Sequence, residues 1–240
     1  MRLENIAWDA RDPQRLGRFW SAALDASPLS DGPDLVEARM PLADGAFLDL
    51  CFQRVPDPSR APARLHLDLR GGADQAAVVE RLLALGARHA DIGQGAVPWV
   101  VLADPEGNAF CVMEERAVYR DTGPIAALPL DSADLARDAE FWAAVTGWVP
   151  WDGMTWAATL RHPSGTGPLL ELCPEREPRR GKNRLHLDVR RDPGSGDPTD
   201  QLLALGARRL SAPGEFPWIV FADPSGNELC VLPPVEPTPD

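Results

Sequence analysis

The sequence has few cysteines and no long apolar run. Four cysteines in 240 residues do not form a disulfide framework. No apolar segment approaches the roughly 20 residues that cross a bilayer. The first five residues include an acidic side chain and lack the apolar segment of a secretory signal. The sequence therefore predicts a cytoplasmic protein with no membrane partner.

Basic side chains are also scarce. The chain has 24 Lys and Arg against 36 Asp and Glu, a formal net charge of −12. Neutralising nucleic-acid phosphates needs a surplus of basic residues, so nucleic acid is excluded as a partner, and anionic membranes are disfavoured for the same reason. Glycine-rich phosphate loops, nucleophile elbows, His-Glu-x-x-His and Cys-x-x-Cys are absent too. Any functional site must therefore be formed by residues that are far apart in the sequence.

The chain contains the same unit twice. Arg64–Arg70 recurs as Arg184–Arg190, Leu82–Arg88 recurs letter for letter as Leu202–Arg208, and Pro98–Asn108 matches Pro217–Asn227. The shared order excludes chance, and the unit is a whole domain, longer than a solenoid repeat. We predict two domains, residues 1–118 and 122–236.

Each half reads as helices alternating with strands. Asp12 can cap a helix that has Pro13 at its first position. A second helix is expected over residues 75–85, where Gly86 suits the left-handed conformation that ends it. Residues 64–70 alternate apolar and polar side chains, which is typical of a strand. Helices covering one face of a sheet give an α+β architecture.

Polar side chains gather on one face of these strands. The first half places Asp9, Asp49, Arg64, His66 and Asp68 on this face, and the second places Asp131, Glu171, Arg184, His186 and Asp188 there. Such a face can simply be solvated. It can also line a concave site, because a histidine and several carboxylates point the same way. We favour the lined cavity.

Two of the four histidines, His66 and His186, occupy equivalent strand positions. A lone strand histidine is more often a hydrogen-bonded core residue than a ligand. Here a carboxylate from a neighbouring strand and a cysteine from the last strand could join it, and imidazole, carboxylate and thiolate are ligands for Zn²⁺ or Fe²⁺. The candidate metal ligands are His66, Asp49, Cys111, His186, Glu171 and Cys230.

Four features together resemble the vicinal oxygen chelate superfamily, in its glyoxalase and bleomycin-resistance branch. They are an Asp-led helix ending in Phe19-Trp20, the Arg-Leu-His-Leu-Asp strand, the Leu-Leu-Ala-Leu-Gly-Ala helix end, and Asp-Pro-x-Gly-Asn before a last strand with cysteine. The resemblance covers nearly the whole chain twice. It implies tandem glyoxalase-like domains, each of two βαβββ modules whose curled mixed sheets form a cup.

The resemblance also implies a set of metal-ligand positions. They correspond to Asn5, Asp49, His66 and Cys111 in the first half, and to Ala127, Glu171, His186 and Cys230 in the second. This set departs from the family pattern, since Asn or Ala replaces the first histidine and Cys replaces the final glutamate. The divalent metal implied is Zn, Fe, Ni or Mn.

Three functions compete at this point. The first is a metal-independent protein that binds a small cationic or aromatic ligand, with tryptophans 99, 151, 156 and 218 beside carboxylates. Its predicted ligand-binding residues are Asp9, Arg64, Asp68, Trp99, Asp131, Arg184, Asp188 and Trp218. The second is a metal-dependent lyase, isomerase or dioxygenase in which Glu171 and His186 are catalytic. In the third, one half is a non-catalytic duplicate. A monomer or homodimer is expected in each case.

Overall fold

The computed structural model describes residues 1–42, 45–152, 157–177 and 181–235. The first repeat forms two βαβββ modules. Their elements are β1 (Arg2–Ala10), α1 (Pro13–Leu24), β2 (Ser27–Asp31), β3 (Leu35–Pro41) and β4 (Phe47–Arg54), then β5 (Asp68–Gly72), α2 (Gln75–Ala84), β6 (Arg88–His89), β7 (Val100–Ala103) and β8 (Ala109–Glu114). A single 3-10 turn, η2 (Ala117–Tyr119), joins the repeats.

The second repeat has the same element order. Its elements are β9 (Ile125–Ser132), α3 (Leu135–Thr146), β10 (Val149–Pro150), β11 (Ala158–Arg161) and β12 (Leu169–Pro174), then β13 (Leu185–Arg190), α4 (Thr199–Ala204), β14 (Arg208–Arg209), β15 (Ile219–Ala222) and β16 (Glu228–Leu232). The predicted α+β class and the four βαβββ modules are confirmed.

The helix signals in the sequence act as expected. The Asp12 side chain accepts a hydrogen bond from the Arg15 backbone N–H, with Pro13 opening α1. The buried stripe of α1 includes Phe19 and Trp20, so this pair belongs to the core. Helix α2 ends at the predicted place, where Gly86 adopts a φ of +113°.

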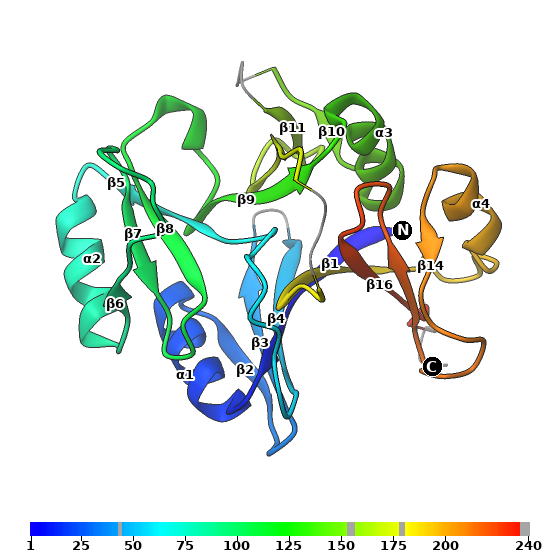
Figure 1. Ribbon diagram of the computed structural model, residues 1–240, viewed down its shortest axis with the longest axis horizontal. Coiled ribbons are helices and arrows are strands. Elements are labelled where there is room, and N and C mark those ends of the chain that lie inside the picture. The colour runs from blue at the N-terminus through cyan, green and yellow to red at the C-terminus, as the bar shows by residue number, and fades with distance from the viewer. Residues whose placement is uncertain (43–44, 153–156, 178–180, 236–240) are drawn as a thin grey trace.

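The strands assemble into two eight-stranded sheets, and each sheet takes one module from each repeat. The order is β14-β15-β16-β13-β1-β4-β3-β2 in sheet A and β10-β11-β12-β9-β5-β8-β7-β6 in sheet B. In Figure 1 the modules of sheet B, including β5, β8 and β9, lie at the left and top, and those of sheet A lie at the centre and right. Each hollow is therefore shared between repeats, which differs from the expectation that each repeat curls around its own site.

The chain passes between the sheets twice. It leaves sheet A for sheet B between β4 and β5, and returns to sheet A between β12 and β13. Only residues 115–124 separate β8 from β9, and the second and third modules pair through β5 and β9. The first and fourth modules then pair through β1 and β13. The domain boundaries at residues 118 and 122 stay a prediction. They describe the sequence repeat, whereas each sheet contains strands from both sides of these boundaries.

The repeated His-Leu-Asp segment is less regular in the first half. Strand β13 begins at Leu185, but β5 begins only at Asp68, and Leu65 forms an isolated bridge with Leu130. The pairing of β5 with β9 shifts register between Asp68 and Leu69. A shift at this point breaks the ladder, so His66 precedes the regular strand.

One core of buried side chains from all four helices lies between the sheets. The indole N–H of Trp20 donates to Asp104 and that of Trp142 donates to Asp223, each over 3.1 Å. These bonds tie the first helix of each repeat to its Asp-Pro-x-Gly-Asn turn. No helix in the described ranges is long and apolar enough to cross a membrane.

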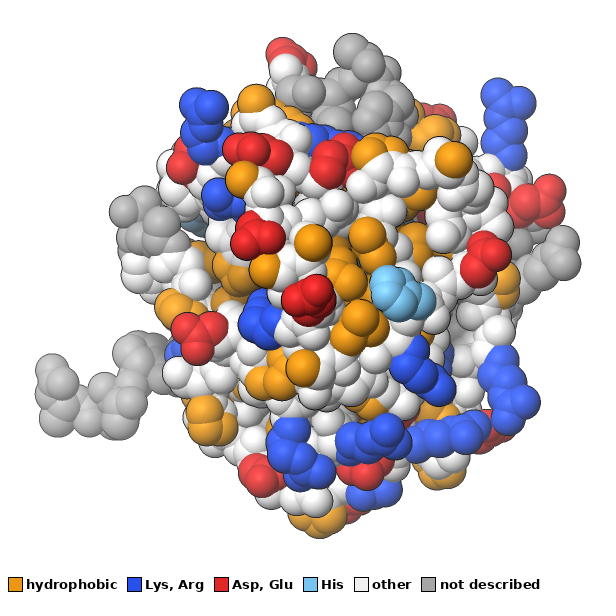
Figure 2. Space-filling view, turned by 90° about the vertical axis from the view of Figure 1, so that its left-hand side faces the viewer, with side chains coloured by type: hydrophobic (Ala, Val, Ile, Leu, Met, Phe, Trp, Pro, Cys, Tyr) orange, Lys and Arg blue, Asp and Glu red, His pale blue; other side chains and the backbone are white. Residues whose placement is uncertain are grey.

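The outer surface is mixed in character. Figure 2 shows the side of α2, where apolar side chains form small patches between charged ones and basic side chains gather along the lower edge. Such a distribution is ordinary for an exposed protein surface. The features that point to function lie on the inner faces of the sheets.

Candidate functional site

The concave face of sheet A encloses a cavity of about 590 Å³. Alternation along β1 turns Asn5, Ala7 and Asp9 into this cavity, while Ile6 and Trp8 enter the core. Strand β13 contributes His186 and Asp188 in the same way, from the other repeat. Of the predicted polar face, Asp9, His186 and Asp188 line this cavity.

A histidine, an aspartate and a cysteine meet in this cavity. The His186 Nε2 atom lies 3.2 Å from an Asp188 carboxylate oxygen and 3.5 Å from the Cys230 Sγ atom. Asn5 donates to the other Asp188 oxygen over 3.2 Å. The register places Asp188 opposite both Asn5 and Cys230, so three adjacent strands hold the group.

The charges in this group depend on one another. Burial alone would lower the pKa of His186, but the neighbouring Asp188 and Cys230 raise it well above its ordinary value. Burial raises the pKa of the Cys230 thiol despite the opposing effect of His186. The raised pKa values favour the protonated imidazole and the neutral thiol, and a metal would have to displace protons from the group.

The wall of the cavity is aromatic and acidic. The rings of Phe216 and Trp218 stack with centroids 5.6 Å apart and an interplanar angle of 5°. Five acidic residues line the cavity against Lys182, Arg190 and His186. An excess of carboxylates disfavours anionic ligands and suits neutral or cationic ones.

Sheet B carries the equivalent His-Asp-Cys group, but different side chains pack around it. His66 Nε2 lies 3.2 Å from an Asp68 oxygen, and potential ligand atoms of His66, Asp68 and Cys111 all lie within 4.8 Å of one another. Tyr119 of the inter-repeat turn is 2% exposed and packs on this face. It belongs to an apolar cluster separate from the main core, made of Val101, Cys111, Met113, Tyr119, Ala126, Ala127 and Leu169.

Glu171 lies fully buried on the same face of sheet B. Burial and, to a smaller extent, the neighbouring Asp68 carboxylate raise the pKa of its carboxyl to about 8. The Tyr119 hydroxyl is close enough to oppose this shift in part, but neither group completes a hydrogen bond within the described ranges. Thr159, directly across from Glu171, is also unsatisfied. Buried polar groups of this kind are normally hydrogen-bonded to ordered water or to a polar ligand.

The structure corrects the predicted grouping of ligands. Glu171 is on β12 in sheet B, whereas His186 and Cys230 are in sheet A, so these three residues do not form one site. Asp49 is on the sheet of His186, not that of His66. It forms two hydrogen bonds of 2.7 and 2.8 Å with Arg39. The exchange of modules between repeats is the reason.

The strand register also corrects the match between Asp49 and Glu171. Asp49 pairs with Asn5, whereas Glu171 pairs with Pro129, two residues further along its neighbour than the matching Ala127. The structural counterpart of Glu171 is therefore Cys51, which pairs with Ala7. A slip of two residues keeps side chains on the same face, so the pattern of the sequence could not reveal it.

Arg64 and Arg184, predicted to bind ligand, hold the turns of the opposite repeat. Arg64 donates to the Asn227 side chain over 2.9 Å, and Arg184 donates to the Glu106 carboxylate over 3.0 Å. Arg184 also borders a separate cavity of about 420 Å³. These two arginines join the repeats and do not line the sheet A cavity.

The remaining predicted residues divide between the sheets. Trp99 packs beside the sheet B cluster, 5.7 Å from the Arg116 guanidinium. Asp131 is also on sheet B, and burial raises the pKa of its carboxyl although Arg64 and His66 lower it. Trp156 lies outside the described residues. Sheet A thus brings together Asp9, Asp188, His186, Cys230 and Trp218.

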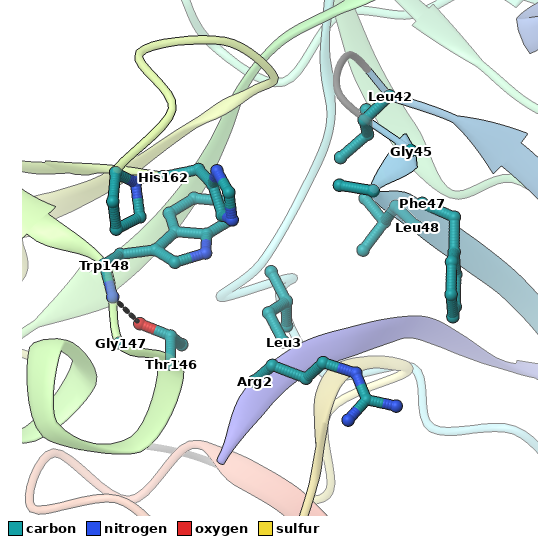
Figure 3. Close-up of a pocket in the computed structure, with 12 residues that line it drawn as sticks. Arg2, Leu3, Leu42, Gly45, Phe47, Leu48, Thr146, Gly147, Trp148 and His162 are labelled. Atoms are coloured by element: carbon teal, nitrogen blue, oxygen red, sulfur yellow. Dashed lines mark hydrogen bonds between the residues drawn. The ribbon is translucent and has the colours of Figure 1, made fainter. Parts of the chain in front are cut away.

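A further cavity of about 320 Å³ lies where the two sheets meet. Figure 3 shows Trp148 and His162 on one side and Leu42 and Leu48 on the other, with Leu3 between them. The Trp148 and His162 rings meet edge to face at 6.4 Å. No motif in the sequence marks this cavity, because its walls come from four separate segments.

The sequence reasoning also missed Lys182 and Tyr119. Lys182 is the only lysine in the chain, and Tyr119 is the only tyrosine. One lies in the hollow of each sheet: Lys182 lines the sheet A cavity and Tyr119 fills sheet B. Their rarity was a visible signal, although it did not say where the fold would place them.

Comparison with known proteins agrees with this geometry. The sequence pattern of the glyoxalase-like domain matches residues 5–113 and again residues 127–232. The chain belongs to this family. The resemblance to the vicinal oxygen chelate superfamily is thus confirmed, and the protein is a tandem glyoxalase-like protein of unspecified ligand.

Solved structures show the same fold. A mutant of glyoxalase I from Zea mays is 17% identical with a TM-score of 0.65, over 97% of this chain and 92% of that one. A putative dioxygenase from Bacillus subtilis subsp. subtilis str. 168 is 14% identical with a TM-score of 0.62, over 98% of this chain and 86% of that one. No curated protein matches. At these identities the likeness establishes the fold alone.

Proposed function

We propose that this glyoxalase-like protein binds a small aromatic molecule in the sheet A cavity. The observation that carries the proposal is the 590 Å³ hollow, in which stacked Phe216 and Trp218 share the lining with His186 and Asp188. Ligand sites are usually apolar hollows of roughly 300–1,000 Å³ with a few convergent polar groups. On the corresponding face of sheet B the buried Tyr119 ring packs in an apolar cluster, which supports sheet A as the binding site.

The lining suggests how such a ligand is held. The aromatic wall offers a flat apolar surface for a ring. The His186, Asp188 and Cys230 side chains supply polar groups at one place in this lining. The acidic rim disfavours anions. Together these features support a neutral or cationic aromatic ligand.

Calorimetry with 2-phenylethanol, a neutral aromatic probe, tests the proposal. Saturable 1:1 binding is expected, and Trp218→Ala should weaken it about tenfold through lost ring contact. Trp99→Ala, which removes an indole from sheet B, is the matched control and should leave affinity unchanged. No saturable binding, or equal losses in both variants, would contradict this site.

A divalent metal in the same cavity is the second candidate function. Ligand atoms of His186, Asp188 and Cys230 all lie within 4.8 Å of one another, and the buried His186 Nδ1 atom lacks a hydrogen-bond partner in the described ranges. Nitrogen, oxygen and sulfur donors of this kind fit Zn²⁺ or Fe²⁺. When bound, the metal would polarise a carbonyl or enolate oxygen.

Elemental analysis of protein purified without chelators, followed by zinc titration, tests this candidate. His186→Ala should reduce zinc affinity by about 100-fold or more, whereas His89→Ala, at the exposed histidine outside both groups, should not change it. Protein that neither contains nor takes up metal removes this function.

The cytoplasmic location and the monomer or homodimer state stay predictions.

A further inference from the structure

The carboxylate of Asp9 is buried in the sheet A cavity and has one partner in the described ranges. Its side chain is 4% exposed, and Lys182 Nζ lies 2.7 Å from one of its oxygens and also contacts the other. Strand β1 fixes Asp9 between paired strands on both sides. A buried carboxylate needs such a partner, because desolvation of an unpaired charge is costly.

Lys182 itself is held far less firmly. Its side chain is 53% exposed, and it follows Gly181, which has a φ of +80°, in the segment before β13. It is the only lysine among 24 basic residues, so every other Lys/Arg position is arginine. Lysine presents a compact single ammonium on a flexible stem, whereas arginine offers a rigid fork. Breaking the pair by moving the flexible, exposed Lys182 side chain therefore costs less free energy than moving the buried Asp9 side chain.

We propose that Asp9 is a cation subsite of this cavity and that Lys182 is its internal occupant, which the ammonium group of a ligand displaces. The ligand class is an aromatic amine, with its ring toward Phe216 and Trp218 and its nitrogen on Asp9. This inference rests on the proposed function of the cavity. The excess of acidic groups over basic ones in the lining agrees with it.

The opposite role for Lys182 makes the opposite prediction. If Lys182 bound an anionic ligand group, its removal would weaken binding. If it only competes with a cationic ligand for Asp9, its removal strengthens binding. The sign of the change therefore decides between the two roles.

Calorimetry with three matched probes measures that sign. The probes are 2-phenylethylammonium, neutral 2-phenylethanol and anionic 3-phenylpropanoate. Lys182→Met should tighten binding of the ammonium about tenfold, and Asp9→Asn should weaken it about tenfold, the size of one charge pair in a partly buried site. Neither change should alter affinity for the alcohol by more than about twofold. Asp131→Asn, the equivalent position in sheet B, should alter none of them.

Thermal denaturation gives an independent readout. Lys182→Met leaves the Asp9 charge without its partner, so its melting temperature should fall, and the ammonium probe should raise it by more than the alcohol does at the same concentration. In the wild-type protein, reductive ¹³C-methylation labels one lysine besides the N-terminal amine. Its NMR signal should move when the ammonium binds and stay when the alcohol binds.

Several results would overturn the inference. Unchanged or weaker ammonium binding in Lys182→Met, or a wild-type preference for the propanoate, rules out displacement at Asp9. If the alcohol binds and depends on Trp218 in such an experiment, the proposed function of the cavity still stands. Failure of all three probes to bind overturns both.

Discussion

The two sheets have the same arrangement of strands and the same His-x-Asp and Cys pattern, but their hollows differ. Sheet A keeps a cavity lined by the His186 group, the aromatic wall and Lys182. In sheet B the connection between the repeats places Tyr119 on the corresponding face. In the second repeat the corresponding exit after β16 continues into exposed Pro233 and Val235. A duplicated fold can thus differ in function through the segment that leaves its last strand.

The two faces also differ in how well their polar groups are satisfied. In sheet A, Asp9 pairs with Lys182 and Asp49 pairs with Arg39, while the His186 Nδ1 atom lacks a hydrogen-bond partner in the described ranges. In sheet B, Glu171 and its neighbours Tyr119 and Thr159 all lack partners there. Sheet B therefore leaves more buried polar atoms unsatisfied among the residues described, and Tyr119 contributes apolar contact more than hydrogen bonding.

The largest expected effect tests whether Tyr119 is structural. Tyr119→Ala should destabilise the protein by about 4 kcal/mol, because a buried aromatic ring is removed from a packed cluster. Phe216→Ala, on the open wall of sheet A, should cost less than about 1 kcal/mol. Urea denaturation of both variants measures the difference. Equal losses would mean that the two hollows are filled to the same degree.

The next effect concerns the pH dependence that Glu171 imposes. Its pKa rises from 4.5 to about 8 on folding, so the folded protein holds a proton that the unfolded chain releases between these values. Stability should therefore fall as pH rises, by about 3 kcal/mol between pH 5 and 7.5. Glu171→Gln should remove that part of the slope.

Chemical denaturation at several pH values checks this prediction, with Glu37→Gln in the sheet A cavity as the control. The control should keep the wild-type slope. If the slope of Glu171→Gln matches that of the wild type, the carboxyl is ionised in the folded protein and sheet B is more hydrated than its burial indicates.

A smaller effect should be the same in both repeats. Asp104→Asn and Asp223→Asn each leave an indole N–H and an asparagine amide without their acceptor. Each should cost about 2 kcal/mol, and the two should agree within about 0.5 kcal/mol. Thermal denaturation of the pair checks this. A large difference would show that the repeats diverge in their frameworks as well as in their hollows.

The local parts of the fold were predictable because they depend on short-range signals. Asp12 and Pro13 begin α1, Gly86 follows the end of α2, and apolar alternation marks the strands. The site was predictable only in its composition. His186, Asp188 and Cys230 do meet, as the shared polar face indicated, but Glu171 joins the other sheet.

By itself, the sequence determined the duplication, the α+β modules and the side chains that turn toward a hollow, because periodicity and turn chemistry act over a few residues. Only the tertiary structure decided which modules share a sheet, since that depends on pairing between strands far apart in the sequence. It also decided where the single lysine and the single tyrosine lie. Lys182 pairs with a buried carboxylate in the sheet A cavity, and Tyr119 packs on the face of sheet B, because the segments that carry them lie against different sheets.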